Sequence, residues 1–440
     1  MYKTEIKLMM IKKLIVLFVV TASLNEAYAQ LKQHPVITSS TAAAAGMSAK
    51  RLQRIDTVLQ RALNDKWTNE AQALIIRNGK IAYSKSFGYN DVERKIKLPD
   101  NGIFRIASQT KAITSVAIMM LYEEGKLLLN EPVSKYIPSF KNPVVLDQYN
   151  EKDTTYTTIP AKKEITIRHL LTHTSGIAYS QIGGGPLNSI YYKNNIICGL
   201  GLEDKLLGNE MKILGTLPLL HDPGEHFTYG LNTDVLGYIV EIISGMSLDD
   251  FFHKKIFEPL GMKDTYFYLP VEKQNRLINL YIVNADGSLR KSPGYFEVNN
   301  NIMTDYPKAK GTYFSGSAGL CSTIMDYAIF LQMLLNGGEY NDNRILSRNS
   351  VRMMTMNQVG LLNSGPHKFG LGFQIVTEES SALGPQQPGT FSWGGAFSTT
   401  YWVDPKEKII GLLYRQLWDD QHEDELNNKF KVLVYQAIND

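Results

Sequence analysis

Strand-forming segments stand near the N-terminal end of this 440-residue chain, far in sequence from a second set near the C-terminal end. In the first set, apolar residues 73–76 and 81–83 flank Asn78-Gly79. This dipeptide favours a two-residue hairpin turn, because both central positions of that turn need positive φ. Residues 126–310, which lie between the two sets, have the pattern of helices separated by Pro- and Gly-rich loops. A chain arranged in this way forms one sheet only if its two ends come together.

The second set comprises three predicted strands and a final helix. The strands cover residues 391–393, 399–403 and 409–414, and the helix covers residues 424–438. Asp404-Pro405 makes the turn between the last two strands. We therefore expect an α and β fold, in which one antiparallel sheet from both chain ends is flanked by terminal helices and carries an inserted, mostly helical lobe. A ligand site is expected in the cleft between the two lobes.

The first 29 residues have the pattern of a secretory signal. Lys12 and Lys13 precede an apolar run at residues 14–20, and Ala27 and Ala29 stand just before a cleavage point at Gln30. The apolar run is shorter than the roughly 20 residues of a membrane-spanning helix. We expect an exported protein, periplasmic or secreted, with no stable membrane span after cleavage. The expected domains are a signal (1–29), a linker (30–45) and one folded domain (46–440), with an α/β lobe (46–110 and 311–440) and a helical lobe (111–310).

Charge and cysteine content narrow the possible partners. The formal net charge is +3, of which the signal contributes +2, so the remainder is almost neutral. Because there is also no dense basic stripe, we do not expect nucleic-acid binding. Cys198 and Cys321 could form one disulfide after export or remain buried thiols. The pattern indicates no particular oligomeric state.

Ser108 and Lys111 form a Ser-x-x-Lys pattern where a strand leads into a helix predicted at residues 108–124. Residues i and i+3 share one face of a helix, so the Lys111 amine can reach Ser108 Oγ. A serine hydroxyl becomes a nucleophile when a base takes its proton, and a desolvated lysine amine can be that base. Ser108 alone could equally be a helix cap. A second match, Ser288 to Lys291, lies in a predicted loop with no helix to position its lysine.

Two further segments belong with this pair. Residues 223–237 place Tyr229 in a Pro- and Gly-rich loop just before a helix. The sequence WGGA at residues 393–396 ends one predicted strand and leads into the next. Its glycines let a substrate lie along the strand edge while a backbone N–H points at the reacting oxygen. Each aromatic residue on its own would more simply be part of a packed core.

In this order, the three elements resemble the serine β-lactamase and penicillin-binding-protein superfamily. Within it, the chain is most similar to the family VIII carboxylesterases and their class C β-lactamase relatives. Three other sequences support the resemblance: LLTHTSG (170–176), FEPLGM (257–262) and GSAGLCST (316–323). The resemblance runs from about residue 48 to the C-terminus. It implies a β-lactamase/transpeptidase-like fold and a serine hydrolase with no metal and no organic cofactor.

The resemblance also implies roles for individual residues. Ser108 would be the nucleophile, Lys111 its general base, and Tyr229 the group that passes the proton to the leaving group and helps activate the deacylating water. The backbone N–H groups of Ser108 and Ala396 would form the oxyanion hole. Substrate contacts are expected from Asn232, Trp393, Gly394 and Gly395.

Two departures from the β-lactamase pattern favour ester substrates. Asn232 comes one residue later than in the usual Tyr-x-Asn, which puts an amide contact to a β-lactam in doubt. Trp393 replaces the lysine that, in β-lactamases and transpeptidases, helps hold a substrate carboxylate. An indole instead favours apolar or aromatic acyl esters, although Arg415 on the adjacent strand could restore a cation.

We therefore predict a carboxylesterase that acts on a small-molecule ester or amide. A β-lactamase or D-amino-acid peptidase is the second hypothesis, and a catalytically silent binding or sensor protein is the third. His169 and His173 stand four apart and could bind a metal, but no third ligand accompanies them, so a structural role at a helix end is expected. A Ser-His-Asp hydrolase is disfavoured, because the chain lacks the nucleophile elbow Gly-x-Ser-x-Gly.

Overall fold

The structure is a computed structural model that describes residues 34–180, 184–197, 199–200, 205–296, 299–362 and 365–439. The predicted signal at 1–29, the start of the predicted linker (30–33) and Cys198 lie outside these residues. Within them, no helix is both long enough and apolar enough to cross a bilayer. Cys321 is buried and carries a free thiol.

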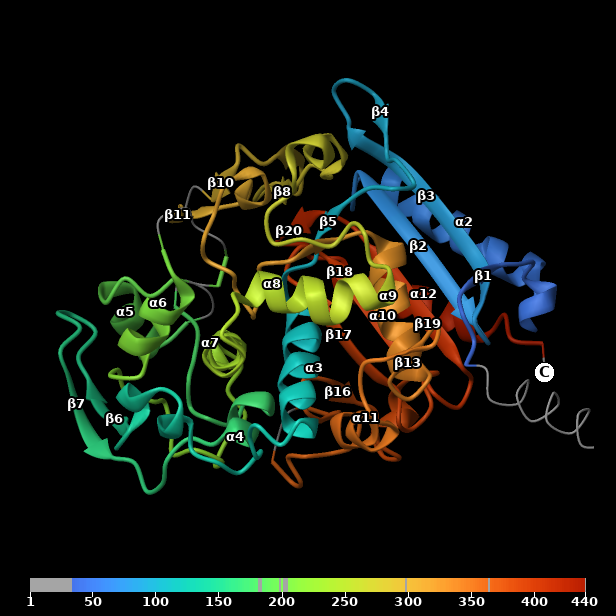
Figure 1. Cartoon of the computed structure of the whole chain (residues 1–440). Coiled ribbons are helices and arrows are strands. Elements are labelled where there is room, and N and C mark those ends of the chain that lie inside the picture. The colour runs from blue at the N-terminus through green and yellow to red at the C-terminus, as the bar shows by residue number, and fades with distance from the viewer. Residues whose placement is uncertain are drawn as a thin grey trace, which may run out of the picture.

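A central sheet joins the two ends of the chain, as predicted (Figure 1). Its strand order is β1-β3-β2-β19-β18-β17-β16-β15, with β4 paired to β3. All neighbours are antiparallel except β1 and β3, which are parallel. The strands are β1 (Thr38–Ser39), β2 (Glu70–Arg77), β3 (Lys80–Asp91), β4 (Ile96–Lys97), β15 (Lys368–Phe369), β16 (Gln374–Ile375), β17 (Phe391–Gly395), β18 (Thr399–Asp404) and β19 (Ile409–Tyr414).

Strand β2 shows how local sequence and packing agree in this sheet. Asn78 and Gly79 turn the chain from β2 into β3 with φ of 55° and 72°, as the dipeptide predicts. Along β2, Leu74 and Ile76 face one apolar cluster, while Ala73 and Ile75 face another. Because successive side chains of a strand point to opposite faces, β2 is buried on both sides. The sheet therefore needs a helical layer on each face.

The outer layer consists of α2 (Ala49–Asn64) and α12 (Glu423–Tyr435), one from each end of the chain. Figure 1 shows α2 on the outer side of β2 and β3. Helix α2 begins where Ser48 Oγ accepts a hydrogen bond of 3.3 Å from Arg51 N. Its buried residues, Leu52, Ile55 and Leu59, follow helical spacing and pack in the same cluster as Phe430 of α12.

The inner layer contains α3 (Thr110–Glu123) and α10 (Ile324–Leu335). Helix α3 is buried along most of its length, from Thr110 to Met119. In Figure 1 it stands between the sheet and the helices of the middle segment. The remaining helices are α4 (Ile167–Leu171), α5 (Pro186–Lys193), α6 (Leu207–Leu214), α7 (Asn232–Ser244), α8 (Leu248–Phe252), α9 (Glu258–Leu260) and α11 (Arg348–Met354).

The middle of the chain contains more strand than the helical pattern predicted. Its strands form the hairpin β6 (Val144–Tyr149) and β7 (Tyr156–Pro160), the hairpin β8 (Tyr281–Val283) and β9 (Leu289–Lys291), and the pair β10 (Tyr295–Phe296) and β11 (Asn299–Met303). All five residues of β7 are exposed and only Val145 of β6 is buried, so the hairpin lacks a regular alternation of buried apolar residues. In the same part of the chain, α8 is followed directly by a π-helical turn over His253–Phe257.

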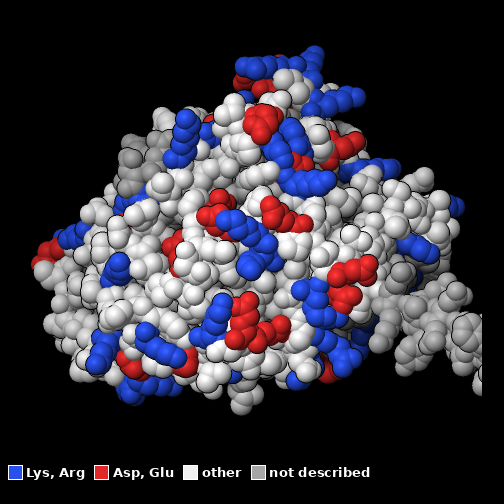
Figure 2. All heavy atoms as spheres, in the orientation of Figure 1, with Lys and Arg blue, Asp and Glu red and all other residues white. Residues whose placement is uncertain are grey.

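Charged side chains of opposite sign are intermingled on the face shown in Figure 2. Elsewhere in the described residues, exposed charges are paired across short distances, such as Lys254 with Asp250 at 2.8 Å and Lys126 with Glu124 at 2.7 Å. Exposed pairs of this kind add little stability, typically about 0–1 kcal/mol each.

Candidate active site

Ser108 lies in a short turn between a strand and the buried helix α3. Strand β5 (Phe104–Arg105) pairs with β12 (Cys321–Ser322), and a 3-10 turn over Ala107–Gln109 then leads into α3. Ala107, just before Ser108, has a φ of 42°, which is strained for a residue with a side chain. Ser108 is partly exposed, although its neighbours on both sides are buried. The predicted helix therefore begins two residues later than expected, and the turn presents the hydroxyl.

The Lys111 amine is within hydrogen-bond distance of Ser108, as the spacing predicted. Lys111 Nζ donates to Ser108 Oγ at 3.2 Å, to Tyr179 OH at 2.8 Å and to the Ser317 carbonyl at 2.9 Å. The side chain is only 2% exposed. Three acceptors around one nearly buried amine hold it in a defined position, close enough to take a proton from Ser108.

Tyr229 contacts Lys111 through its ring rather than through its hydroxyl. Lys111 Nζ lies 4.6 Å from the centre of the Tyr229 ring, a cation–π distance. Within the described residues, the Tyr229 hydroxyl accepts a hydrogen bond of 3.2 Å from Trp393 Nε1. The two rings lie 5.4 Å apart. The structure therefore brings Ser108, Lys111, Tyr229 and Trp393 together, but it bonds the phenol to the indole.

Tyr179 is a site residue that the sequence reasoning missed. Its hydroxyl is the phenol bonded to Lys111, and its ring lies 5.5 Å from that of Tyr229. Tyr179 follows the sequence LLTHTSG by three residues, in a segment without regular secondary structure. A tyrosine in a loop so close to a family-typical motif was the available signal.

Aromatic rings continue outward from the two tyrosines. Phe369 lies 5.2 Å from Trp393, measured between ring centres, and 5.6 Å from His173. His173 lies 4.7 Å from Tyr229. Burial, with a further contribution from the Lys111 charge, holds the pKa of His173 well below its usual range. The histidine is therefore neutral at physiological pH and packs as an aromatic ring.

Asn232 is buried and does not reach the surface of the site. The side chain is 0% exposed; its Oδ1 accepts from Ser175 Oγ, and its Nδ2 lies 3.0 Å from His173 Nδ1. These contacts tie the start of α7 to the LLTHTSG segment. The amide has no exposed atom for a substrate, so its placement does not support the predicted direct contact.

The end of strand β17 lies against the turn that carries Ser108. A Cβ added to Gly395 would come within 2.3 Å of the Ile106 carbonyl oxygen, so only glycine permits this approach. Trp393 and Gly394 are partly buried, and Ala396 is exposed in the turn that follows. The predicted oxyanion-hole residues Ser108 and Ala396 thus belong to two segments that are in contact.

Arg415 does not restore the cation lost at Trp393. The side chain is 0% exposed and forms an ion pair with Asp420, and its other end contacts Asn427. His169, the other residue of the metal hypothesis, instead accepts a hydrogen bond from Thr166 N and completes a capping box at α4. No group of three His, Cys, Asp or Glu residues suited to a metal ion occurs among the described residues.

The chain is similar to several known proteins over most of its length. Residues 55–436 match the family described as Beta-lactamase. The chain is 28% identical over 392 residues to "Esterase EstB" of Burkholderia gladioli, covering 86% of this chain and 92% of the esterase. It is 27% identical over 394 residues to a "Putative D-alanyl-D-alanine carboxypeptidase" of Escherichia coli strain K12, covering 85% and 84%. Among solved structures, "EstCE1, a hydrolase with promiscuous acyltransferase activity" superposes with a TM-score of 0.72 at 25% identity, covering 89% of this chain and 99% of that one.

Proposed function

The chain belongs to the beta-lactamase family and is a serine hydrolase, and from this premise we propose that it is an exported carboxylesterase that forms an acyl-enzyme on Ser108. The single observation that carries the proposal is the position of the Lys111 amine, 3.2 Å from Ser108 Oγ and nearly buried. A hydroxyl with an adjacent amine base is the arrangement that acyl transfer needs.

In the proposed reaction, Lys111 takes the proton of Ser108 while Oγ attacks the ester carbonyl carbon. The carbonyl oxygen becomes an oxyanion that accepts hydrogen bonds from the backbone N–H groups of Ser108 and Ala396. A tyrosine hydroxyl, that of Tyr229 or Tyr179, relays the proton to the leaving alkoxide, which departs as an alcohol. Water then attacks the acyl-enzyme, the carboxylic acid leaves, and Ser108 regains its proton.

The proposed preference for esters rests on the aromatic side chains around Ser108 and Lys111. Trp393, Tyr229 and Phe369 present aromatic rings, which suit an apolar or aromatic acyl group. Trp393 stands where a substrate carboxylate would need a cation, and Arg415 is already paired with Asp420. Gly394, next to Trp393 on β17, leaves room for a substrate along the strand edge. The relative named as an esterase fits this preference.

A substrate panel tests the proposal. We expect p-nitrophenyl acetate or butyrate to be hydrolysed faster than a chromogenic cephalosporin or a D-alanyl p-nitroanilide under the same conditions. A fluorophosphonate should label Ser108 stoichiometrically, and Ser108→Ala should abolish both labelling and turnover. The carboxypeptidase relative favours the second hypothesis, so faster turnover of the D-alanyl amide would reverse the ranking. Absence of labelling and turnover would favour a silent binding protein.

Export is proposed from the predicted signal at 1–29, ahead of the linker at 30–45 and the hydrolase domain at 46–440. Expression of the full chain in a Gram-negative host, followed by fractionation, should place the protein outside the cytoplasm. The mature N-terminus should be Gln30. An intact N-terminus in the cytoplasmic fraction would contradict the proposal.

A further inference from the structure

Asp234, in helix α7, is a fully buried carboxylate close to the proposed base. The side chain is 0% exposed. Its Oδ1 accepts hydrogen bonds from Ser315 Oγ at 2.8 Å and from Ser317 N at 3.1 Å. Its Oδ2 is buried and has no hydrogen-bond partner among the described residues.

The two serines bonded to Asp234 belong to the turn at residues 315–319. Ser315 Oγ also accepts from Ala318 N at 3.1 Å, and Gly319 N donates to the Ser315 carbonyl at 3.1 Å. A Cβ on Gly316 would come within 2.5 Å of the Thr233 carbonyl oxygen, so the turn lies directly on α7. Through its hydrogen bonds to Ser315 and Ser317, Asp234 therefore anchors this turn to α7.

The same turn supplies one of the three partners of Lys111. The Ser317 residue that donates its N–H to Asp234 offers its carbonyl to Lys111 Nζ at 2.9 Å. Burial raises the pKa of Asp234, and the positive charge of Lys111 opposes that shift. The Asp234 carboxyl and the Lys111 amine are therefore linked through the Ser317 peptide.

We propose that Asp234 is a positioning residue of the reaction: it holds the turn at 315–319 so that the Ser317 carbonyl fixes the Lys111 amine beside Ser108. This inference rests on the proposed function, because it concerns the base of that reaction. Asp234 acts through Ser317 and Lys111 and does not touch the substrate itself.

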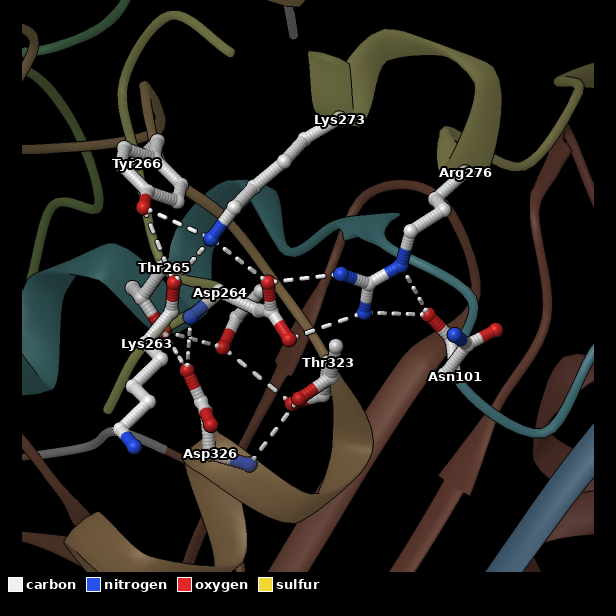
Figure 3. A network of polar contacts seen from close by, with 10 residues as sticks. Asn101, Lys263, Asp264, Thr265, Tyr266, Lys273, Arg276, Thr323 and Asp326 are labelled. Atoms are coloured by element: carbon white, nitrogen blue, oxygen red, sulfur yellow. Dashed lines mark hydrogen bonds and ion pairs between the residues drawn. The ribbon is translucent and has the colours of Figure 1, made fainter. Parts of the chain in front are cut away.

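Asp326 is a matched control, because it is a buried carboxyl with the same kinds of hydrogen-bond donors but has no link to Lys111. It is 7% exposed, and its Oδ2 accepts from Asp264 N at 2.7 Å and Thr265 Oγ1 at 3.0 Å, again one backbone N–H and one hydroxyl. Figure 3 shows Asp326 beside Asp264, which in turn pairs with Arg276 and Lys273. Lys111 is not part of this network. Asp326→Asn makes the same chemical change at a similar burial, away from the base.

The test compares Asp234→Asn, Asp234→Ala and Asp326→Asn with the wild type on p-nitrophenyl acetate. Asp234→Ala should lower kcat about 10²-fold with KM changed less than about twofold, because the base is misplaced while the substrate wall is intact. Asp234→Asn keeps an acceptor at Oδ1, so it should retain more activity than the alanine variant. Asp326→Asn should lower the unfolding temperature but leave kcat and the pH profile unchanged.

The two Asp234 variants separate the hydrogen bonds at Oδ1 from the packing of the side chain, because asparagine keeps an acceptor there and alanine does not. Wild-type kcat in both Asp234 variants would overturn the inference.

A crystal structure of Asp234→Ala gives a readout that does not depend on turnover. We expect the turn at 315–319 to shift and the hydrogen bond from Lys111 Nζ to the Ser317 carbonyl to be lost. If the alanine variant does not fold, Ser315→Ala, which removes one of the two donors to Oδ1, serves in its place. A wild type that neither hydrolyses esters nor labels at Ser108 would refute the proposed function. An unmoved turn would refute the role of Asp234.

Discussion

Lys111 shares its amine among Ser108, Tyr179 and Ser317, and this sharing leaves two phenols next to the proposed base. The Tyr229 ring lies against the amine, while its hydroxyl is bonded to Trp393. The Tyr179 hydroxyl is bonded to the amine directly. Both hydroxyls are therefore candidates for the proton relay, and substitution decides between them.

We expect Tyr229→Phe to lower kcat about 10²-fold, as is typical of a lost proton transfer, and Tyr179→Phe to lower it less, because only one hydrogen bond to Lys111 disappears. Single-turnover acylation with p-nitrophenyl acetate measures the step in question. Tyr192→Phe, at a tyrosine that is 47% exposed, controls for the loss of a hydroxyl far from the buried amine. The opposite ranking would assign the relay to Tyr179.

Sequence spacing was sufficient for Ser108 and Lys111 because both stand on one short stretch, where helical geometry fixes their distance. Tyr179 could not be found in that way, since its approach to Lys111 spans 68 positions of the chain and depends on how an irregular loop folds. Asn232 shows the reverse case. Its position, one residue later than in the usual Tyr-x-Asn, still suggested a substrate contact, but burial at the start of α7 turns its amide inward.

At the scale of elements, the site exists because β17 meets the turn before α3. The strand was predicted from its composition and from the turn that follows it, and so were β18 and β19. The contact itself was expected only from the family resemblance, which placed the Ser108 and Ala396 N–H groups in one oxyanion hole. Composition and spacing do not show it, because it depends on the missing side chain of Gly395 and on the backbone of Ile106. The hairpin of β6 and β7 was not predicted, since β7 is exposed along its whole length and β6 buries only Val145.

Gly395→Ala should therefore disturb both the fold and the site. Its Cβ would lie 2.3 Å from the Ile106 carbonyl oxygen and 2.5 Å from Thr399 Oγ1, so the strand must move away from the turn. We expect an overpacking cost of about 1–3 kcal/mol in the free energy of unfolding and a lower kcat for ester hydrolysis. Gly384→Ala is the control, because its Cβ meets nothing within 4 Å. Equal stability and activity in the two variants would contradict the close approach.

At the scale of the whole molecule, the two chain ends are joined where β2 pairs with β19, and β2 begins at a buried glutamate. Glu70 is 0% exposed; its Oε1 accepts from Gln416 N at 2.7 Å, and its Oε2 has no partner among the described residues. Burial raises the pKa of Glu70 to about 8, and the Gln416 hydrogen bond and the Arg415 charge only partly oppose this. The junction between the chain ends, which we call the seam (the paired strands β2 and β19 with Glu70), thus contains a carboxyl group whose neutral form is favoured in the folded state.

This preference makes the stability of the seam depend on pH. Below the ordinary glutamate pKa of 4.5, Glu70 is protonated in both the folded and the unfolded chain. Between 4.5 and about 8, the unfolded chain has lost the proton and the folded chain keeps it, so stability falls as pH rises, by up to about 1.4 kcal/mol per pH unit. Above about 8, both states are ionised and the loss levels off.

Glu70→Gln removes this titration while keeping the size of the side chain. The variant should be close to the wild type in stability at pH 5 and more stable than the wild type at pH 8, as measured by urea unfolding at the two pH values. Glu272→Gln, at an exposed glutamate, should show no such divergence. If the difference between Glu70→Gln and the wild type is the same at pH 5 and pH 8, the buried carboxyl does not titrate in the seam, and the chain ends are held together independently of its charge.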